Sequence, residues 1–164
     1  MNTLYAPWRS SYIKKEKVGK KEKEECPFCV AALSTQDAAH FVLSRNADVL
    51  VLLNKYPYNA GHLLIIPLVH CATLEGLSPK VRASMMEAAT LWSEILKKEL
   101  VCQGLNIGIN LGVVSRGSIP DHLHMHVLPR WQGDTNFLAT LADVKLISAD
   151  LQTMYYMLVS KLSE

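Results

Sequence analysis

The sequence lacks the long apolar run that a membrane-spanning helix needs, and its opening residues, MNTLYAPWRSSYIKK, contain no apolar core of a secretory signal. It also contains no internal repeat. These absences argue against membrane, secreted and repeat proteins, so we expect a cytoplasmic protein. A chain of 164 residues can bury a sizeable core, and we predict a single domain over residues 1–164.

Outside one segment, the sequence also lacks a net excess of either positive or negative charge. Residues 14–25, KKEKVGKKEKEE, hold six of the 17 basic and four of the 15 acidic residues, which leaves 11 of each sign elsewhere. We predict that this segment is a charged, flexible loop. Its interleaved glutamates and its lack of aromatic residues argue against a nucleic-acid partner.

Cysteine is scarce: the chain has four, and two of them form the motif Cys26-Pro-Phe-Cys29. In a cytoplasmic protein this spacing indicates metal or redox chemistry rather than a structural disulfide. A two-residue gap lets both thiolates face one ion, and zinc prefers four Cys and His ligands. A reduced pair at a turn is the simpler alternative, and a thioredoxin-like site would need a βαβ pattern that we do not find. We interpret Cys71 and Cys102 as small buried apolar residues.

Three histidines alternate with apolar residues in HLHMHVL, residues 122–128. Because successive side chains of a strand point to opposite faces, a strand here places His122, His124 and His126 on one face and buries the other. The alternative is a half-buried strand with incidental histidines. Half of the chain's six histidines fall within five residues, which favours metal binding, acid–base work or nucleophilic catalysis.

Such a strand suits chemistry at phosphorus. A neutral imidazole is nucleophilic through its free ring nitrogen, and its attack on phosphorus gives a phosphoramidate that can pass the group onward. The site also needs donors for the phosphate oxygens. The loop at residues 115–118 offers hydroxyls and, at Gly117, close backbone approach, while Asn110 lies on the preceding predicted strand.

The remaining pattern predicts an α+β fold with an antiparallel sheet. Strand-like segments span residues 40–45, 49–54, 62–69, 105–111 and about 122–130, with a last one near 144–147. One long helix begins at Pro79 after the N-cap Ser78 and is expected to end at Gly104. Pro67 should mark an edge, a bulge or the end of its strand, and a second amphipathic helix should begin near residue 149.

The H-x-H-x-H segment resembles the motif of the histidine triad (HIT) family, and further matches follow in the family's order. Residues 54–67, NKYPYNAGHLLIIP, resemble its nucleoside-binding strand and turn. Residues 126–137, HVLPRWQGDTNF, and 6–13, APWRSSYI, resemble the branch related to diadenosine polyphosphate phosphorylases and hydrolases. The resemblance covers about residues 4–148. It implies a HIT-like fold of about five antiparallel strands, one long helix and a C-terminal helix, paired as a homodimer through the long helix and its neighbouring strand.

The resemblance also implies residue roles. His124 would attack the α-phosphorus and form a nucleotidyl-histidine intermediate, and His126 would hold and orient the site. Asn110 would contact phosphate and Asn54 the ribose, and His62 would be structural or lie at the pocket edge. The implied substrate-binding set is Asn54, Asn110, Gly117, Ser118 and His126.

One position departs from the family pattern. Many members carry a glutamine where Ser118 follows Gly117. A hydroxyl is shorter and has one donor proton instead of two. The phosphorylase branch tolerates this change, so it favours phosphate over water as the acceptor.

Zinc-bearing family members combine a C-x-x-C near the start, a histidine after the "IP" strand and the first triad histidine. This resemblance implies a closed structural Zn²⁺ site made of Cys26, Cys29, His70 and His122. A site with no open position would not activate water.

Three functions fit the sequence. The first is a hydrolase or nucleotidyltransferase that cleaves dinucleoside polyphosphates or related nucleotides, with adenine favoured. The second is an adenosine 5′-phosphoramidase, which uses the same nucleophile and a different leaving group. The third is a nucleotide-binding module that forms no covalent intermediate.

Overall fold

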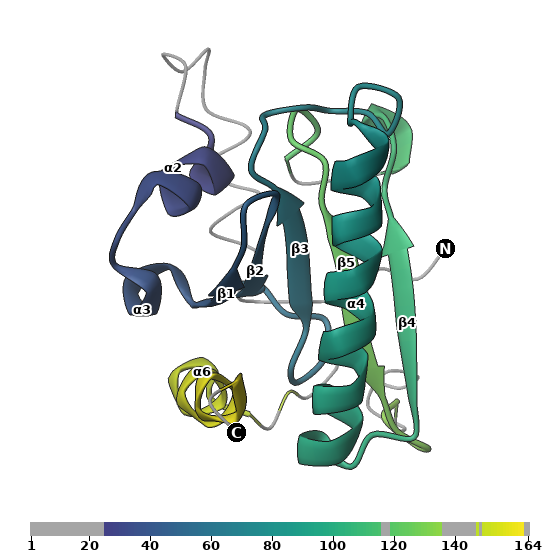
Figure 1. Cartoon of the computed structure of the whole chain (residues 1–164). Helices are drawn as coiled ribbons and strands as arrows, with labels where there is room; N and C mark the ends of the chain where they lie inside the picture. The colour runs from purple at the N-terminus through teal and green to yellow at the C-terminus, as the bar shows by residue number, and fades with distance from the viewer. Residues whose placement is uncertain (1–24, 116–118, 136–146, 148, 163–164) are drawn as a thin grey trace, which may run out of the picture.

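The computed structural model describes residues 25–115, 119–135, 147 and 149–162, and in this part the chain forms one five-stranded sheet (Figure 1). All neighbouring strands are antiparallel, in the order β1-β2-β3-β5-β4. The bounds are β1 Val42–Arg45, β2 Val49–Leu53, β3 Leu63–Pro67, β4 Gly104–Ile109 and β5 Met125–Arg130. The predicted α+β class is confirmed. The predicted loop at 14–25 and the strand near 144–147 lie outside the described residues, apart from Glu25 and Ile147.

The long helix is α4, Pro79–Leu100, which runs along one face of the sheet (Figure 1). It begins as predicted, with Pro79 in its first turn and the Ser78 hydroxyl accepting from the backbone N–H of Val81. Its buried face consists of Met85, Ala89, Trp92 and Leu96. These side chains pack in one core with the apolar residues that alternate with the histidines, which are Leu123, Met125 and Val127.

The predicted end of this helix at Gly104 is wrong. The helix ends at Leu100, and Val101 takes the left-handed conformation at φ 49° that usually favours glycine. The indole N–H of Trp131 donates to the Leu100 carbonyl at 3.1 Å, so a distant side chain satisfies one of the terminal carbonyls. Gly104 instead begins β4.

Shorter helices lie at the other side of the sheet and at its ends. Helix α2, Pro27–Leu33, packs Phe28 and Ala31 on the face opposite α4, against β1, β2 and β3. Helix α3, Asp37–His40, leads into β1, and α6, Leu151–Val159, contacts β1 with Asp150 as its N-cap. The α2 helix was not predicted, and α6 begins two residues after the expected position. None of the helices in the described ranges has the length and apolar character needed to cross a membrane.

The histidine segment enters the sheet later than the sequence predicts. Strand β5 begins at Met125, so His122 and His124 precede it. The last pair between β3 and β5 is Ile65 with Met125, and two residues further along β3 lies Pro67, which has no N–H to donate to a neighbouring strand. The Leu123 N–H instead donates to the Cys71 carbonyl at 2.7 Å. Pro67 is the last residue of β3, which is one of the three roles predicted for it. His122 and His124 therefore lie outside the paired part of the sheet.

Candidate active site

A backbone carbonyl beside His124 fixes which of its two ring nitrogens carries the proton. The Nδ1 of His124 donates a hydrogen bond to the carbonyl oxygen of His122 at 2.9 Å. Because a carbonyl only accepts, Nδ1 carries the proton and Nε2 keeps its lone pair. The residue is 4% exposed, and burial lowers the pKa of His124, partly opposed by the hydrogen bond to His122. The result is a neutral ring with a nucleophilic nitrogen.

His126 is bound to a fourth histidine from another part of the chain. The Nε2 of His62 and the Nδ1 of His126 are 2.9 Å apart. The Nδ1 of His62 already accepts the Tyr58 backbone N–H at 3.1 Å and the Asn54 amide N–H at 3.2 Å. Two donors on Nδ1 leave the His62 proton on Nε2, from which it is donated to His126. When neutral, the His126 ring then carries its own proton on Nε2.

The two triad rings lie close enough to act on one substrate. The ring centroids of His124 and His126 are 5.0 Å apart in an edge-to-face arrangement. Tyr58 stacks on His126 with centroids 5.9 Å apart. A lone pair on one ring and an N–H donor on the other form a nucleophile with an adjacent electrophilic group.

Of the two roles expected for His62, structural or at the pocket edge, its position favours the structural one. The residue is fully buried, and its place in a chain of hydrogen bonds to His126 makes it part of the site rather than an edge residue. The available signal was the turn that precedes it. Gly61 has φ +68°, a backbone conformation that residues with a Cβ rarely adopt, so glycine favours this turn just before His62.

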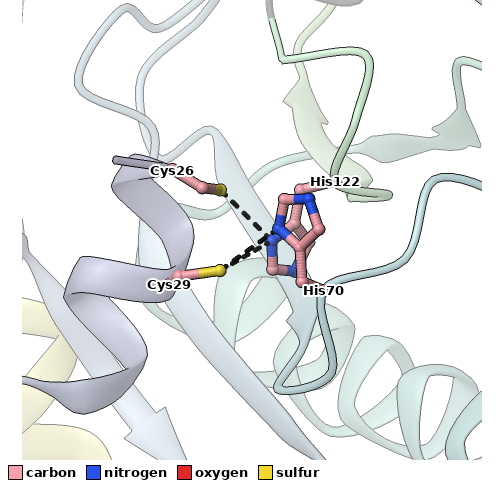
Figure 2. A group of neighbouring side chains, drawn as sticks. All are labelled: Cys26, Cys29, His70 and His122. Carbon is pink, nitrogen blue, oxygen red and sulfur yellow. Dashed lines mark hydrogen bonds between the residues drawn. The ribbon is translucent and has the colours of Figure 1, made fainter. Parts of the chain in front are cut away.

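The four residues predicted to bind zinc lie together. Their ligand atoms fall within 4.8 Å of one another, and Figure 2 shows the two thiols facing the two imidazoles. Because Pro27 begins α2, Cys26 is the N-cap residue and Cys29 lies on the same side of the helix one turn later. His70 follows β3 and His122 precedes β5, so three segments of the chain meet here.

The spacing of these ligand atoms fits a tetrahedral ion. The Nδ1 of His122 is 3.3 Å from the Cys26 sulfur and 3.6 Å from the Cys29 sulfur, and the Nδ1 of His70 is 3.2 Å from the Cys29 sulfur. Tetrahedral zinc with ordinary bond lengths separates sulfur from nitrogen by about 3.5 Å.

The orientation of His122 also suits a metal ligand. Its Nε2 donates to the Pro67 carbonyl at 2.9 Å, which leaves the lone pair on Nδ1 directed at the thiols. Metal-bound histidines usually make such a second hydrogen bond. Burial lowers the pKa of His122, and a neutral imidazole is the form that binds zinc.

A family model of the HIT domain matches residues 35–133, more than half of the chain. The chain belongs to the HIT domain family. This confirms the resemblance found in the sequence. An AP-4-A phosphorylase of Mycobacterium tuberculosis is 33% identical to this chain over 152 residues, covering 90% of this chain and 77% of that protein. The asymmetrical bis(5′-nucleosyl)-tetraphosphatase of Schizosaccharomyces pombe is 29% identical over 82 residues, covering 50% of this chain and 44% of that protein.

Solved structures agree with the HIT assignment. A zinc-bound histidine triad family protein from Mycobacterium smegmatis superposes with a TM-score of 0.69 at 26% identity, covering 85% of this chain and 96% of that one. The predicted HIT-like fold is therefore confirmed.

The structure describes Asn54 and Asn110 from the predicted substrate-binding set, and Ser115 from the loop expected to offer hydroxyls. Asn54 follows β2, and its amide also accepts from the Tyr56 N–H at 2.9 Å, so it orders the turn that fixes His62. Asn110 is exposed and directly follows β4, whose Gly108 pairs with His126. Ser115 is turned to its own backbone, with its hydroxyl donating to the Gly112 carbonyl at 2.9 Å. The predicted contacts at Gly117 and Ser118 lie outside the described residues.

Proposed function

We propose that this HIT protein is a nucleotide hydrolase or transferase that cleaves dinucleoside polyphosphates, with adenine favoured, through a covalent nucleotidyl-His124 intermediate. The observation that carries the proposal is the hydrogen bond from Nδ1 of His124 to the His122 carbonyl. It holds the Nε2 lone pair ready for attack without any need to remove a proton first. The names of the phosphorylase and tetraphosphatase relatives support the substrate class.

The reaction proceeds in two displacements at the α-phosphorus. The Nε2 lone pair of His124 forms a bond to the α-phosphorus, and the phosphorus–oxygen bond to the leaving nucleotide breaks with its electron pair. Water, which releases a proton to solvent, or a phosphate dianion then attacks the same phosphorus, and the phosphorus–nitrogen bond breaks to return the lone pair to His124. The protonated Nε2 of His126 supplies a hydrogen-bond donor to the oxygens around phosphorus, held in that form by His62.

The acceptor is expected to be phosphate. With diadenosine tetraphosphate, phosphate as the acceptor gives ADP and ATP, whereas water gives AMP and ATP. We expect added phosphate to raise the turnover rate at least about tenfold and to shift the product to ADP. Product chromatography with and without phosphate measures this. AMP as the product at every phosphate concentration would assign the protein to the hydrolases instead.

Turnover and adduct assays with diadenosine tetraphosphate and adenosine 5′-phosphoramidate separate the rival functions. A phosphoramidase would turn over adenosine 5′-phosphoramidate faster than diadenosine tetraphosphate at equal concentration. A binding module would hold the nucleotide without turnover and without an adduct on His124. The paired arrangement of His124 and His126 supports a catalytic role over simple binding.

We also propose that Cys26, Cys29, His70 and His122 hold one structural Zn²⁺ ion. The donor set, the sulfur–nitrogen separations near those of a zinc tetrahedron and the second hydrogen bond of His122 support it. With four protein ligands the ion would link α2 to the segments that flank β3 and β5. The chemistry at phosphorus would fall to the histidines.

A homodimer formed through β4 and α4 is a further part of the proposal. In the described part of the chain β4 is an edge strand, and Ile107 is 46% exposed on it. Exposed edges with apolar side chains are sites of strand pairing between chains. We expect Ile107→Lys to convert the dimer to a monomer. Light scattering after size-exclusion chromatography measures the mass of each species. Leu33→Lys, at an exposed apolar residue on α2, is the control and should stay dimeric. A monomeric wild-type protein would contradict this part.

A further inference from the structure

Phe28 lies between the two cysteines of the metal site and also contacts the proposed nucleophile. Its ring is buried, with a centroid 5.5 Å from that of His122 and 5.2 Å from that of His124. Both contacts are edge-to-face, the arrangement that aromatic rings prefer because of their charge distribution. One side chain of α2 therefore packs on a ligand of the predicted ion and on the ring that is to attack phosphorus.

The hydrogen bond of His124 does not by itself fix the ring. It holds Nδ1 near the His122 carbonyl, but a single hydrogen bond leaves the imidazole able to rock about that contact. A packed aromatic ring beside it removes that freedom, because buried side chains have little room to leave their rotamers. The direction of the Nε2 lone pair then depends on the position of Phe28.

Phe28 lies next to Cys29 and two residues after Cys26 at the start of α2. Cys26 and Cys29 contact the imidazoles of His122 and His70 on the side of α2 that faces them (Figure 2). An ion held by these four groups would fix the start of α2 against the sheet, and Phe28 with it. The His122 side chain would be held by the ion while its carbonyl holds His124.

We propose that Phe28 is a positioning residue that couples the metal site to the orientation of His124. The proposal rests on the proposed role of His124 as the nucleophile. The competing explanation is that Phe28 only fills the apolar cluster that it shares with Ala31, Val42 and Leu50. A packing role predicts a loss of stability alone, whereas a positioning role predicts a loss of chemical rate at unchanged nucleotide binding.

The test replaces Phe28 with leucine in the full zinc-loaded chain and compares it with Phe41→Leu. Phe41 packs edge-to-face on Tyr155, and the apolar core that it joins is the one under α4, so this control removes the same ring at the other face. We expect both variants to lose stability and keep one equivalent of zinc. Phe28→Leu should lower kcat at least about tenfold with KM unchanged, because small misplacements of a reacting group are costly. Phe41→Leu should keep the wild-type kcat.

A second readout does not depend on turnover. In protein labelled with ¹⁵N-histidine, the Nδ1 proton of His124 should exchange slowly with water in the wild type and in Phe41→Leu. It should exchange at least about tenfold faster in Phe28→Leu, and also in zinc-depleted wild-type protein. Phe28→Met, with similar volume and no ring, gives the same comparison if the leucine variant does not fold.

The outcomes are separable. A Phe28 variant in which the His124 proton exchanges as slowly as in Phe41→Leu overturns the coupling, whatever its kcat. Exchange that is unchanged by zinc removal also overturns it. Failure of the wild type to form a nucleotidyl adduct would overturn the proposed function, while the proton-exchange comparison would still test the positioning of the ring.

Discussion

His124→Asn is expected to lower kcat by at least about 10⁴-fold, since removal of a nucleophile commonly costs that much or more. The asparagine amide can still donate to the His122 carbonyl, so the local backbone should keep its conformation. It has no ring nitrogen with a free lone pair, so the bond to phosphorus cannot form. Steady-state rates with diadenosine tetraphosphate measure the loss, and circular dichroism and thermal melting check the fold.

His40→Asn is the matched control for this variant. His40 ends α3 and lies outside the hydrogen-bonded histidine group, so we expect its activity to equal that of the wild type. Intact-mass spectra after alkaline quenching should show a nucleotidyl adduct on the wild type and on the control, and none on His124→Asn. Substantial turnover by His124→Asn, or an adduct mapped to His126, would contradict the assignment of the nucleophile.

Removal of zinc should lower the free energy of unfolding more than any of the substitutions proposed above. If the free ion in the sample is at a thousand times its Kd, its binding stabilises the fold by about 4 kcal/mol. In a chain of this size that corresponds to a fall in Tm of about 10 °C when a chelator removes it. The ion would join α2 to the segments around β3 and β5, so the loss should appear first at α2, as faster amide exchange of residues 27–33.

Two cysteine variants control the zinc experiment. Cys29→Ser removes one proposed ligand and should reproduce the chelator effect, with zinc content well below one equivalent. Cys71→Ser changes a cysteine that follows His70 directly but lies outside the ligand group, since its sulfur donates to the Thr73 carbonyl. It should bind zinc normally. Protein purified without added metal that contains no zinc, with a Tm unaffected by chelator, would contradict the site.

Local patterns were enough for much of the fold. The Ser78-Pro79 pair predicted the start of α4, because the cap and the fixed φ of proline act on the first turn alone. The alternation around the triad predicted which side of the segment joins the core, and Leu123, Met125 and Val127 all do. The end of α4 could not be predicted in the same way, because Trp131, on a distant loop, satisfies the Leu100 carbonyl there.

In the candidate site too, local features could be predicted from the sequence and long-range contacts could not. Cys26 and Cys29 were recognisable as a pair because their spacing is local, and α2 then places them on one side of a helix. The hydrogen bond between His62 and His126 joins residues 64 apart in the chain, and no spacing in the sequence indicates which ring nitrogen donates. That choice depends on two donors that the turn after β2 aims at His62.

The residue types of the site, the alternation that turns the apolar residues of the triad segment to the core, and the membership of the family can all be read from the amino-acid sequence. The sequence does not show that His122 turns to the thiols while His124 turns to the His122 carbonyl, or that His62 fixes the proton of His126; these arrangements appear only in the folded chain. These roles depend on which ring nitrogen carries a proton. Partners from α2, from the turn before β3 and from the backbone at Pro67 set that choice, and only folding brings them together.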